Sequence, residues 1–182
     1  MKDLLTRGYV VLDNFISPER AADLNAQFKE LYRLYPNDFT QDRRCGKSYS
    51  IYDCWPFLEL LCEKLPEISK IVGEPLFPTY SYSRLYKHDE VLVKHTDRGA
   101  CEVSITLHLG SDGVEWPIYF ERLDNSEEVA LNMKPGQAAL YLGKQIKHWR
   151  NQYEGDDYSQ VFLHYVKARG QYKQCYFDKV RV

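Results

Sequence analysis

The chain has 182 residues, of which 44% are hydrophobic and 27% are charged, which suits a globular protein with a sizeable core. Its formal net charge of −2 gives no electrostatic signal for nucleic-acid binding, and it contains no apolar run long enough for a membrane span. The five cysteines include no Cys-x-x-Cys pair, and residues 1–6 lack a signal-peptide core. We therefore expect a cytoplasmic protein with reduced thiols and no nucleic-acid or membrane partner, while the oligomeric state is not specified.

The N-terminal part predicts one strand and two helices. The strand is the β-branched, apolar segment Gly8–Phe15. Ser17-Pro18-Glu19 then offers an N-cap, a proline in the first turn and an acid, so a helix is expected to run to about Tyr35. A second helix is expected over about 56–72, with Pro66 as a potential break.

Residues 39–56 lie between these helices and carry a mixture of basic and aromatic side chains. Their pattern predicts an irregular loop, which is either an entrance or lid for a site or only a mobile connection.

From residue 77 onward the sequence predicts a series of short strands separated by turns. The expected strands are Tyr80–Tyr86, Val91–His95, Glu102–Leu109, Trp116–Phe120, Val129–Met133, Ala138–Leu142 and Gln160–Val166. This number of short strands favours a β-sandwich or a closed jelly-roll barrel over about 77–168, buttressed by the helices of about 1–75. The whole chain, 1–182, is expected to form a single domain of mainly β structure.

His95 and Asp97 are two positions apart, so on an extended segment their side chains leave the same face. One imidazole and one carboxylate supply two of the three ligands of a 2-His-1-carboxylate iron site. His148, which lies 51 positions beyond Asp97 (148 − 97), is the leading candidate for the third. A ligand so distant in the sequence requires a closed β scaffold to bring it back to the other two.

With these residues in place, the sequence resembles the iron(II)/2-oxoglutarate-dependent dioxygenases, in particular their prolyl-4-hydroxylase-like branch. The resemblance covers most of the chain. Its parts are the Gly8–Phe15 opening with the Ser17-Pro18 helix, Arg84-Leu85-Tyr86, His95-x-Asp97, the segment Lys134–Tyr141, His148 and the last strand, Gln160–Tyr165.

The resemblance implies a double-stranded β-helix, a cupin-like jelly roll, and His95, Asp97 and His148 as ligands of Fe(II). It also implies 2-oxoglutarate and O2 as cosubstrates, hydroxylation of an unactivated C–H bond, and release of succinate and CO2. The substrate would be a peptide residue, with proline among the candidates, or a small molecule.

The expected anchor for the far carboxylate of 2-oxoglutarate departs from the family pattern. Relatives place an arginine or lysine on the final strand, whereas Tyr158–Tyr165 contains neither. Arg150 is the preferred substitute because it lies two residues beyond His148, and Arg84 is its rival. The resemblance also places Tyr86 and His108 at the cosubstrate, and Gln160 and His164 offer further hydrogen-bond donors.

Two other functions remain open at this point. The same three ligands would serve a zinc hydrolase that activates water. Alternatively, the chain is a binding module that kept the barrel without the chemistry, which the missing downstream arginine mildly favours.

Overall fold

The computed structural model describes residues 2–42 and 45–180. The helical elements of this part are α1 (Lys2–Arg7), α2 (Pro18–Leu34), α3 (Trp55–Val72) and the short 3-10 turns η1 (Pro36–Asp38), η2 (Gly99–Cys101) and η3 (Lys173–Asp178). The strands are β1 (Tyr9–Leu12), β2 (Thr40–Asp42), β3 (Cys45–Tyr52), β4 (Leu76–Tyr86), β5 (Leu92–His95), β6 (Val103–Ser111), β7 (Ile118–Glu121), β8 (Glu128–Leu131), β9 (Ala138–Tyr141), β10 (Lys147–Arg150) and β11 (Tyr158–Lys167).

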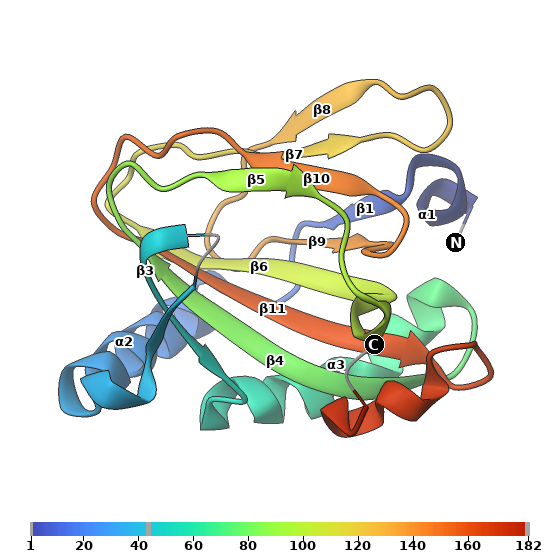
Figure 1. Cartoon of the computed structure of the whole chain (residues 1–182), viewed down its shortest axis with the longest axis horizontal. Coiled ribbons are helices and arrows are strands. Elements are labelled where there is room, and N and C mark those ends of the chain that lie inside the picture. The colour runs from blue at the N-terminus through green and yellow to red at the C-terminus, as the bar shows by residue number, and fades with distance from the viewer. Residues whose placement is uncertain (1, 43–44, 181–182) are drawn as a thin grey trace.

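The strands form two antiparallel sheets that face each other (Figure 1). The major sheet has the order β1-β9-β6-β11-β4-β3-β2, and the minor sheet has the order β5-β10-β7-β8. Several strands that are adjacent in the sheets are distant in the sequence, as in the pairing of β11 with both β4 and β6. This arrangement is a jelly roll, which confirms the prediction from the strand pattern.

The two long helices pack on the face of the major sheet that points away from the minor sheet (Figure 1). α2 begins as its sequence predicts, with the Ser17 hydroxyl accepting a hydrogen bond from the backbone N–H of Arg20 at 3.2 Å. α3 runs through Pro66 without ending and stops at Gly73, whose φ of 83° places it in the left-handed region that glycine tolerates. Phe28 of α2 and Phe57 of α3 are fully buried in the core between the helices and the sheet.

The segment 39–56 differs from the irregular loop that the sequence predicts. β2 and β3 form a hairpin that adds two strands to the major sheet, with Tyr49 opposite Leu85 and Ile51 opposite Ser83 of β4. The usual strand pattern places apolar residues on the buried face, but here the buried residues of β3 include Ser48 and Ser50. The sequence of this segment therefore does not show the alternation that predicts a strand. Arg43 and Arg44 of the candidate lid lie outside the described residues.

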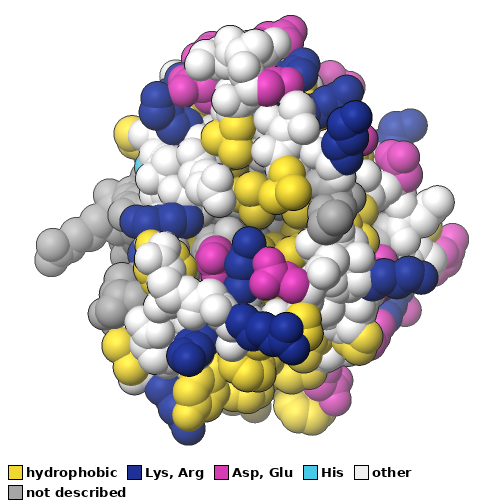
Figure 2. All heavy atoms as spheres, turned by 90° about the vertical axis from the view of Figure 1, so that its right-hand side faces the viewer, with side chains coloured by type: hydrophobic (Ala, Val, Ile, Leu, Met, Phe, Trp, Pro, Cys, Tyr) yellow, Lys and Arg dark blue, Asp and Glu magenta, His cyan; other side chains and the backbone are white. Residues whose placement is uncertain are grey.

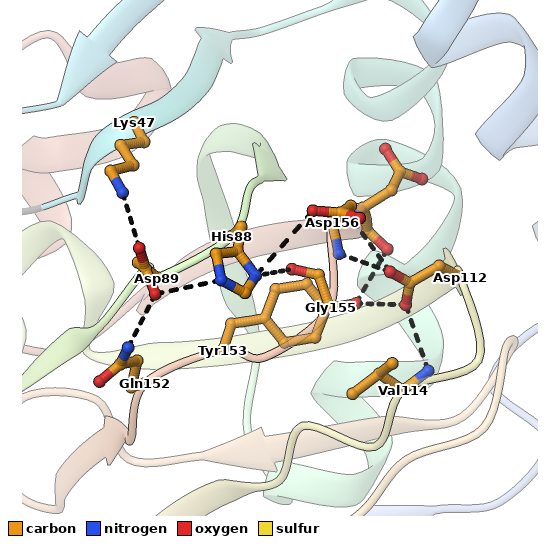
Figure 3. Close-up of polar contacts among 10 residues, drawn as sticks. Lys47, His88, Asp89, Asp112, Val114, Gln152, Tyr153, Gly155 and Asp156 are labelled. Atoms are coloured by element: carbon orange, nitrogen blue, oxygen red, sulfur yellow. Dashed lines mark hydrogen bonds and ion pairs between the residues drawn. The ribbon is translucent and has the colours of Figure 1, made fainter.

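A polar network centred on Asp112 joins the segments that follow β6 and β10 (Figure 3). One carboxylate oxygen of Asp112 accepts hydrogen bonds from the Tyr153 hydroxyl at 2.7 Å and the Val114 N–H at 3.2 Å. The other oxygen accepts from the N–H groups of Asp156 at 2.5 Å and Asp157 at 3.3 Å. Desolvation opposes ionisation here, but these hydrogen bonds outweigh it and lower the pKa of Asp112 to about 2.

We expect Asp112→Asn to reduce the free energy of unfolding by about 1–3 kcal/mol, because an amide cannot accept all four hydrogen bonds. The folded-state pKa of Asp112 lies below its ordinary value of 3.8, so its contribution is present above pH 3.8 and is lost as the pH falls toward 2. Urea unfolding at pH 7 and pH 3 measures both effects. Asp156→Asn is the matched control, since the Asp156 side chain is 91% exposed, and an equal loss in both variants would contradict the assignment.

The surface carries charges of both signs. In the view of Figure 2, side chains of Lys and Arg lie interspersed with those of Asp and Glu, and hydrophobic side chains gather toward the lower edge. Within residues 2–42 and 45–180, the structure contains no helix that combines the length and the apolar character needed to cross a membrane.

Candidate metal centre

The three residues that the sequence singles out as metal ligands come together in the structure. His95 ends β5, Asp97 follows two residues later, and β10 pairs with β5 so that His148 lies opposite His95. The Nε2 atom of His95 is 3.5 Å from Oδ1 of Asp97, and the Nε2 atom of His148 is 3.6 Å from the same oxygen. Strand pairing in the minor sheet therefore supplies the return path across the 51 positions that separate Asp97 from His148.

Backbone carbonyls orient both imidazole rings. Nδ1 of His95 is 2.7 Å from the Val93 carbonyl oxygen, and Nδ1 of His148 is 3.2 Å from the Ile146 carbonyl oxygen. A proton on Nδ1 satisfies each of these contacts and leaves the Nε2 lone pair directed at the group of three. The backbone carbonyls thus favour the tautomer and the ring orientation that a metal ligand needs.

The charge states of the buried ligands also suit a cation. Burial favours the neutral acid at Asp97, but the neighbouring His148 and His95 outweigh it and lower the pKa of Asp97. Burial lowers the pKa of His148, so this imidazole is neutral near pH 7. A carboxylate beside a neutral imidazole is a combination that suits binding of a divalent metal.

Gly143 holds the backbone of Asp97 in place, since its carbonyl accepts a hydrogen bond from the Asp97 N–H at 2.8 Å. A Cβ atom at this position would lie 2.4 Å from the Cys101 carbonyl oxygen and 2.5 Å from Oδ2 of Asp97. These separations are too short for any side chain, so the close approach of the 143 backbone to the ligand requires glycine.

We expect Gly143→Ala to displace Asp97 and to weaken metal binding by about 10–100-fold, the usual cost of disturbing the support of a ligand. Calorimetric titration with Ni²⁺ measures the change. Gly46→Ala is the control because its added Cβ would have no neighbour within 4 Å. Unchanged Ni²⁺ affinity in Gly143→Ala would rule out this role.

The three residues lie in the wall of a cavity of about 310 Å³. Besides His95, Asp97 and His148, the cavity is lined by Tyr52, Tyr80, Tyr82, Arg84, Leu92, Arg98, Cys101, Tyr141, Phe162 and His164. The minor sheet and the segment that follows β5 thus contribute the candidate ligands, whereas β4 and β11 of the major sheet contribute aromatic and basic side chains. A cavity of this size, with a few polar groups on an aromatic wall, suits a small ligand or one residue of a larger one.

No protein-family model matches the sequence, and no curated protein matches it. Among solved structures it is similar to a Pseudomonas putida prolyl-4-hydroxylase, with a TM-score of 0.70, 16% identity, and coverage of 93% of this chain and 97% of that chain. HygX from Streptomyces hygroscopicus, crystallised with nickel and 2-oxoglutarate, gives a TM-score of 0.72 at 13% identity, over 92% of this chain and 86% of that one. SnoK, a non-haem α-ketoglutarate-dependent carbocyclase from nogalamycin biosynthesis, gives 0.76 at 11% identity, over 92% and 82%.

The chain has the fold of the 2-oxoglutarate-dependent oxygenases. The likeness extends over nearly the whole chain, which agrees with the extent of the sequence resemblance. At these identities it establishes the fold, and the chemistry must be argued from the residues in the cavity.

The six residues that the sequence nominates for the cosubstrate fall into two groups in this oxygenase fold. Arg84 and His164 line the cavity that contains the candidate ligands. Tyr86, His108, Arg150 and Gln160 are not among the described residues that line it. Arg84 joins the two groups, because its Nη1 donates a hydrogen bond to the Tyr86 hydroxyl at 3.1 Å.

Arg150 is 1% exposed and is held between two aromatic rings, with its guanidinium carbon 4.6 Å from the Trp116 centroid and 4.8 Å from that of Tyr158. Its Nη1 donates to the Trp116 carbonyl, and its Nη2 donates to Oε1 of Gln160 at 3.2 Å. His108 stacks on Tyr158, and burial, with help from the Arg150 charge, lowers the pKa of His108 to about 3. Arg150, His108 and Gln160 thus belong to a closely packed, buried polar cluster.

Several cavity residues were not proposed from the sequence, among them Arg98, Cys101 and Phe162. Phe162 shares the inner face of β11 with Gln160 and His164 by two-residue alternation, a signal that the sequence does contain. Arg98 immediately precedes the η2 turn and Cys101 is its last residue, and the sequence shows no periodic pattern there.

Proposed function

We propose that the protein is an Fe(II)- and 2-oxoglutarate-dependent oxygenase that hydroxylates an unactivated C–H bond of a small molecule or a peptide residue, with proline among the candidates. The observation that carries the proposal is the convergence of His95, Asp97 and His148, with both Nε2 atoms within 3.6 Å of one carboxylate oxygen. The similarity to solved oxygenase structures supports the same class of reaction.

The donor set fits ferrous iron. Two imidazoles and one carboxylate on one side of a metal leave coordination positions open for further ligands. When bound, iron and 2-oxoglutarate would supply the oxidant that transfers an oxygen atom from O2 to the substrate, with release of succinate and CO2. The chain's own part is to hold these groups, orient the substrate and exclude water.

We propose Arg84 as the anchor of the far carboxylate of 2-oxoglutarate, in preference to Arg150. Arg84 lines the same cavity as the ligands and is only 5% exposed, so its charge acts in a poorly solvated site. Its Nη2 lies 3.5 Å from the Tyr82 hydroxyl, which orients the guanidinium from the same strand. Arg150 is not among the described residues that line this cavity, and its guanidinium donates to the Trp116 carbonyl and to Gln160.

The aromatic wall supports a role in substrate positioning. Tyr80 and Tyr82 of β4 and Phe162 of β11 line the cavity opposite the candidate ligands, and their rings offer flat apolar surfaces. An organic substrate packed against these rings would displace water from the cavity. Exclusion of water protects a reactive site from side reactions.

The experiment is reconstitution of the purified protein with Fe(II) under argon, followed by addition of 2-oxoglutarate and then O2. We expect a visible charge-transfer band when both iron and 2-oxoglutarate are present, and O2-dependent formation of succinate. A screen with ¹⁸O2 of prolyl peptides and small molecules then detects the labelled product by mass spectrometry. Iron binding without the band and without succinate would refute the proposal.

A further inference from the structure

A second group of potential ligands shares Asp97 with the first. Cys101 from η2 and His164 from β11 place ligand atoms so that these atoms and one oxygen of Asp97 all lie within 4.8 Å of one another. Cys101 is 3% exposed and His164 is 5% exposed, yet both line the cavity. They are therefore shielded from bulk water but accessible to an ion that enters the site.

The two oxygens of the Asp97 carboxylate face different neighbours. Oδ1 lies toward the Nε2 atoms of His95 and His148, at 3.5 and 3.6 Å. Oδ2 lies on the side of Ser104, whose hydroxyl is 3.5 Å away and also contacts Nδ1 of His164 at 2.8 Å. Because Asp97 belongs to both groups of potential ligands, its carboxylate can bridge two cations, which in two-metal sites lie about 3.5–4 Å apart.

The neighbours of Cys101 and His164 restrict how these side chains move. The Tyr80 hydroxyl is 3.0 Å from the sulfur of Cys101, and the Tyr80 ring centroid is 4.6 Å from that of His164. The Ser104 hydroxyl fixes the rotation of the His164 imidazole. Contacts of this kind commonly orient metal ligands from behind.

We propose that Asp97, Cys101 and His164 form a second metal site, which takes Zn²⁺ and is bridged to the first site by Asp97. Thiolate, imidazole and carboxylate are the ligands that zinc combines, and the thiolate distinguishes this site from the harder nitrogen and oxygen donors of the first. The cavity leaves room for a fourth ligand from solvent. The site does not depend on 2-oxoglutarate and goes beyond the proposed oxygenase activity.

A purely structural role for these residues is the competing explanation, because buried cysteines commonly pack as small apolar groups. Cys54 illustrates that case, since it is buried within the hydrophobic core between the helices and the major sheet. Cys101 has a different setting, with an imidazole and a carboxylate as neighbours on the wall of a cavity. The combination of three ligand types is what separates the second site from packing alone.

The test titrates chelator-treated protein with Co²⁺, a spectroscopic substitute for Zn²⁺, under argon. We expect two equivalents to bind and a near-ultraviolet thiolate-to-cobalt charge-transfer band to appear. Cys101→Ser should bind one equivalent without the band, and His95→Ala should bind one equivalent with it. Cys62→Ser removes an exposed thiol and should behave as the wild type.

A wild-type titration that ends at one equivalent overturns the proposal, with or without the band. Persistence of the band in Cys101→Ser overturns it as well, because the thiolate would then come from another cysteine. The wild-type stoichiometry requires no variant to fold, and circular dichroism checks Cys101→Ser. Absence of 2-oxoglutarate turnover would affect the proposed function without changing either readout.

Discussion

His148→Ala is expected to abolish 2-oxoglutarate turnover and to weaken Ni²⁺ or Fe(II) binding by more than about a hundredfold, since loss of a ligand exceeds the 10–100-fold cost of a disturbed support. His148 contributes one of the two Nε2 atoms that face Oδ1 of Asp97, and it comes from β10, whereas the other two candidate ligands lie at and just beyond the end of β5. Without it, His95 and Asp97 remain as a two-ligand site. The measurement is Ni²⁺ calorimetry together with a succinate assay.

We expect His148→Ala and Asp97→Asn to fold, so that thermal melting with and without metal distinguishes loss of metal binding from loss of structure. A metal that binds only the folded protein raises its stability. Added Ni²⁺ should therefore raise the melting temperature of the wild type more than that of His148→Ala or of Asp97→Asn, which keeps the shape of the side chain. His88→Ala is the control, since His88 contacts Asp89, Asp156 and Gly155 (Figure 3) and is not among the described residues that line the cavity. A normal Ni²⁺ shift in His148→Ala would remove this residue from the metal centre.

The sequence was most informative where a local pattern and a long-range constraint agreed. The two-residue spacing of His95 and Asp97 already predicts a shared face, and the need for a third ligand points to His148, although β10, the strand that carries His148, is not among the expected strands. In the jelly roll, the pairing of His148 with His95 in the minor sheet brings the distant candidate ligand close to the other two. Both helices were predicted because capping and stop signals, such as Ser17 and Gly73, are local.

Other features depend on contacts that no local pattern encodes. The hairpin of β2 and β3 was predicted as a loop because its stability comes from pairing with β4, across which Tyr49 meets Leu85. The proximity of Cys101 and His164 depends on how η2 packs against β11. The two-residue spacing of His148 and Arg150 places both on one face of a strand but does not say how deep each lies within the barrel. The sequence therefore cannot decide between Arg84 and Arg150 as the anchor.

The second large effect is expected at Arg84. If its guanidinium holds the far carboxylate of 2-oxoglutarate, Arg84→Gln leaves that carboxylate without a charged partner in a site that is poorly solvated. Truncation of one member of a buried, hydrogen-bonded charge pair costs about 2–5 kcal/mol, which corresponds to an increase of about 30- to 4,000-fold in the KM for 2-oxoglutarate. Metal binding should change little, because Arg84 is not one of the three ligands.

Arg150→Gln provides the matched comparison, because it removes the same charge from a position that contacts Trp116 and Gln160 instead of the cavity. Its main expected effect is on stability, since the buried guanidinium packs between the rings of Trp116 and Tyr158. We expect its KM for 2-oxoglutarate to stay within a few-fold of the wild type.

Steady-state kinetics at saturating Fe(II) measures the KM of both variants for 2-oxoglutarate. Calorimetric titration of 2-oxoglutarate into the Ni²⁺-loaded protein measures their affinity for it independently of turnover. Arg84→Lys adds a third comparison, because a lysine keeps the charge but lacks the planar fork that binds a carboxylate through two parallel hydrogen bonds. Its KM should therefore lie between those of the wild type and Arg84→Gln. The reverse ranking, with Arg150→Gln raising KM and Arg84→Gln leaving it unchanged, would transfer the anchor to Arg150 and place the cosubstrate in the polar interior beside His108.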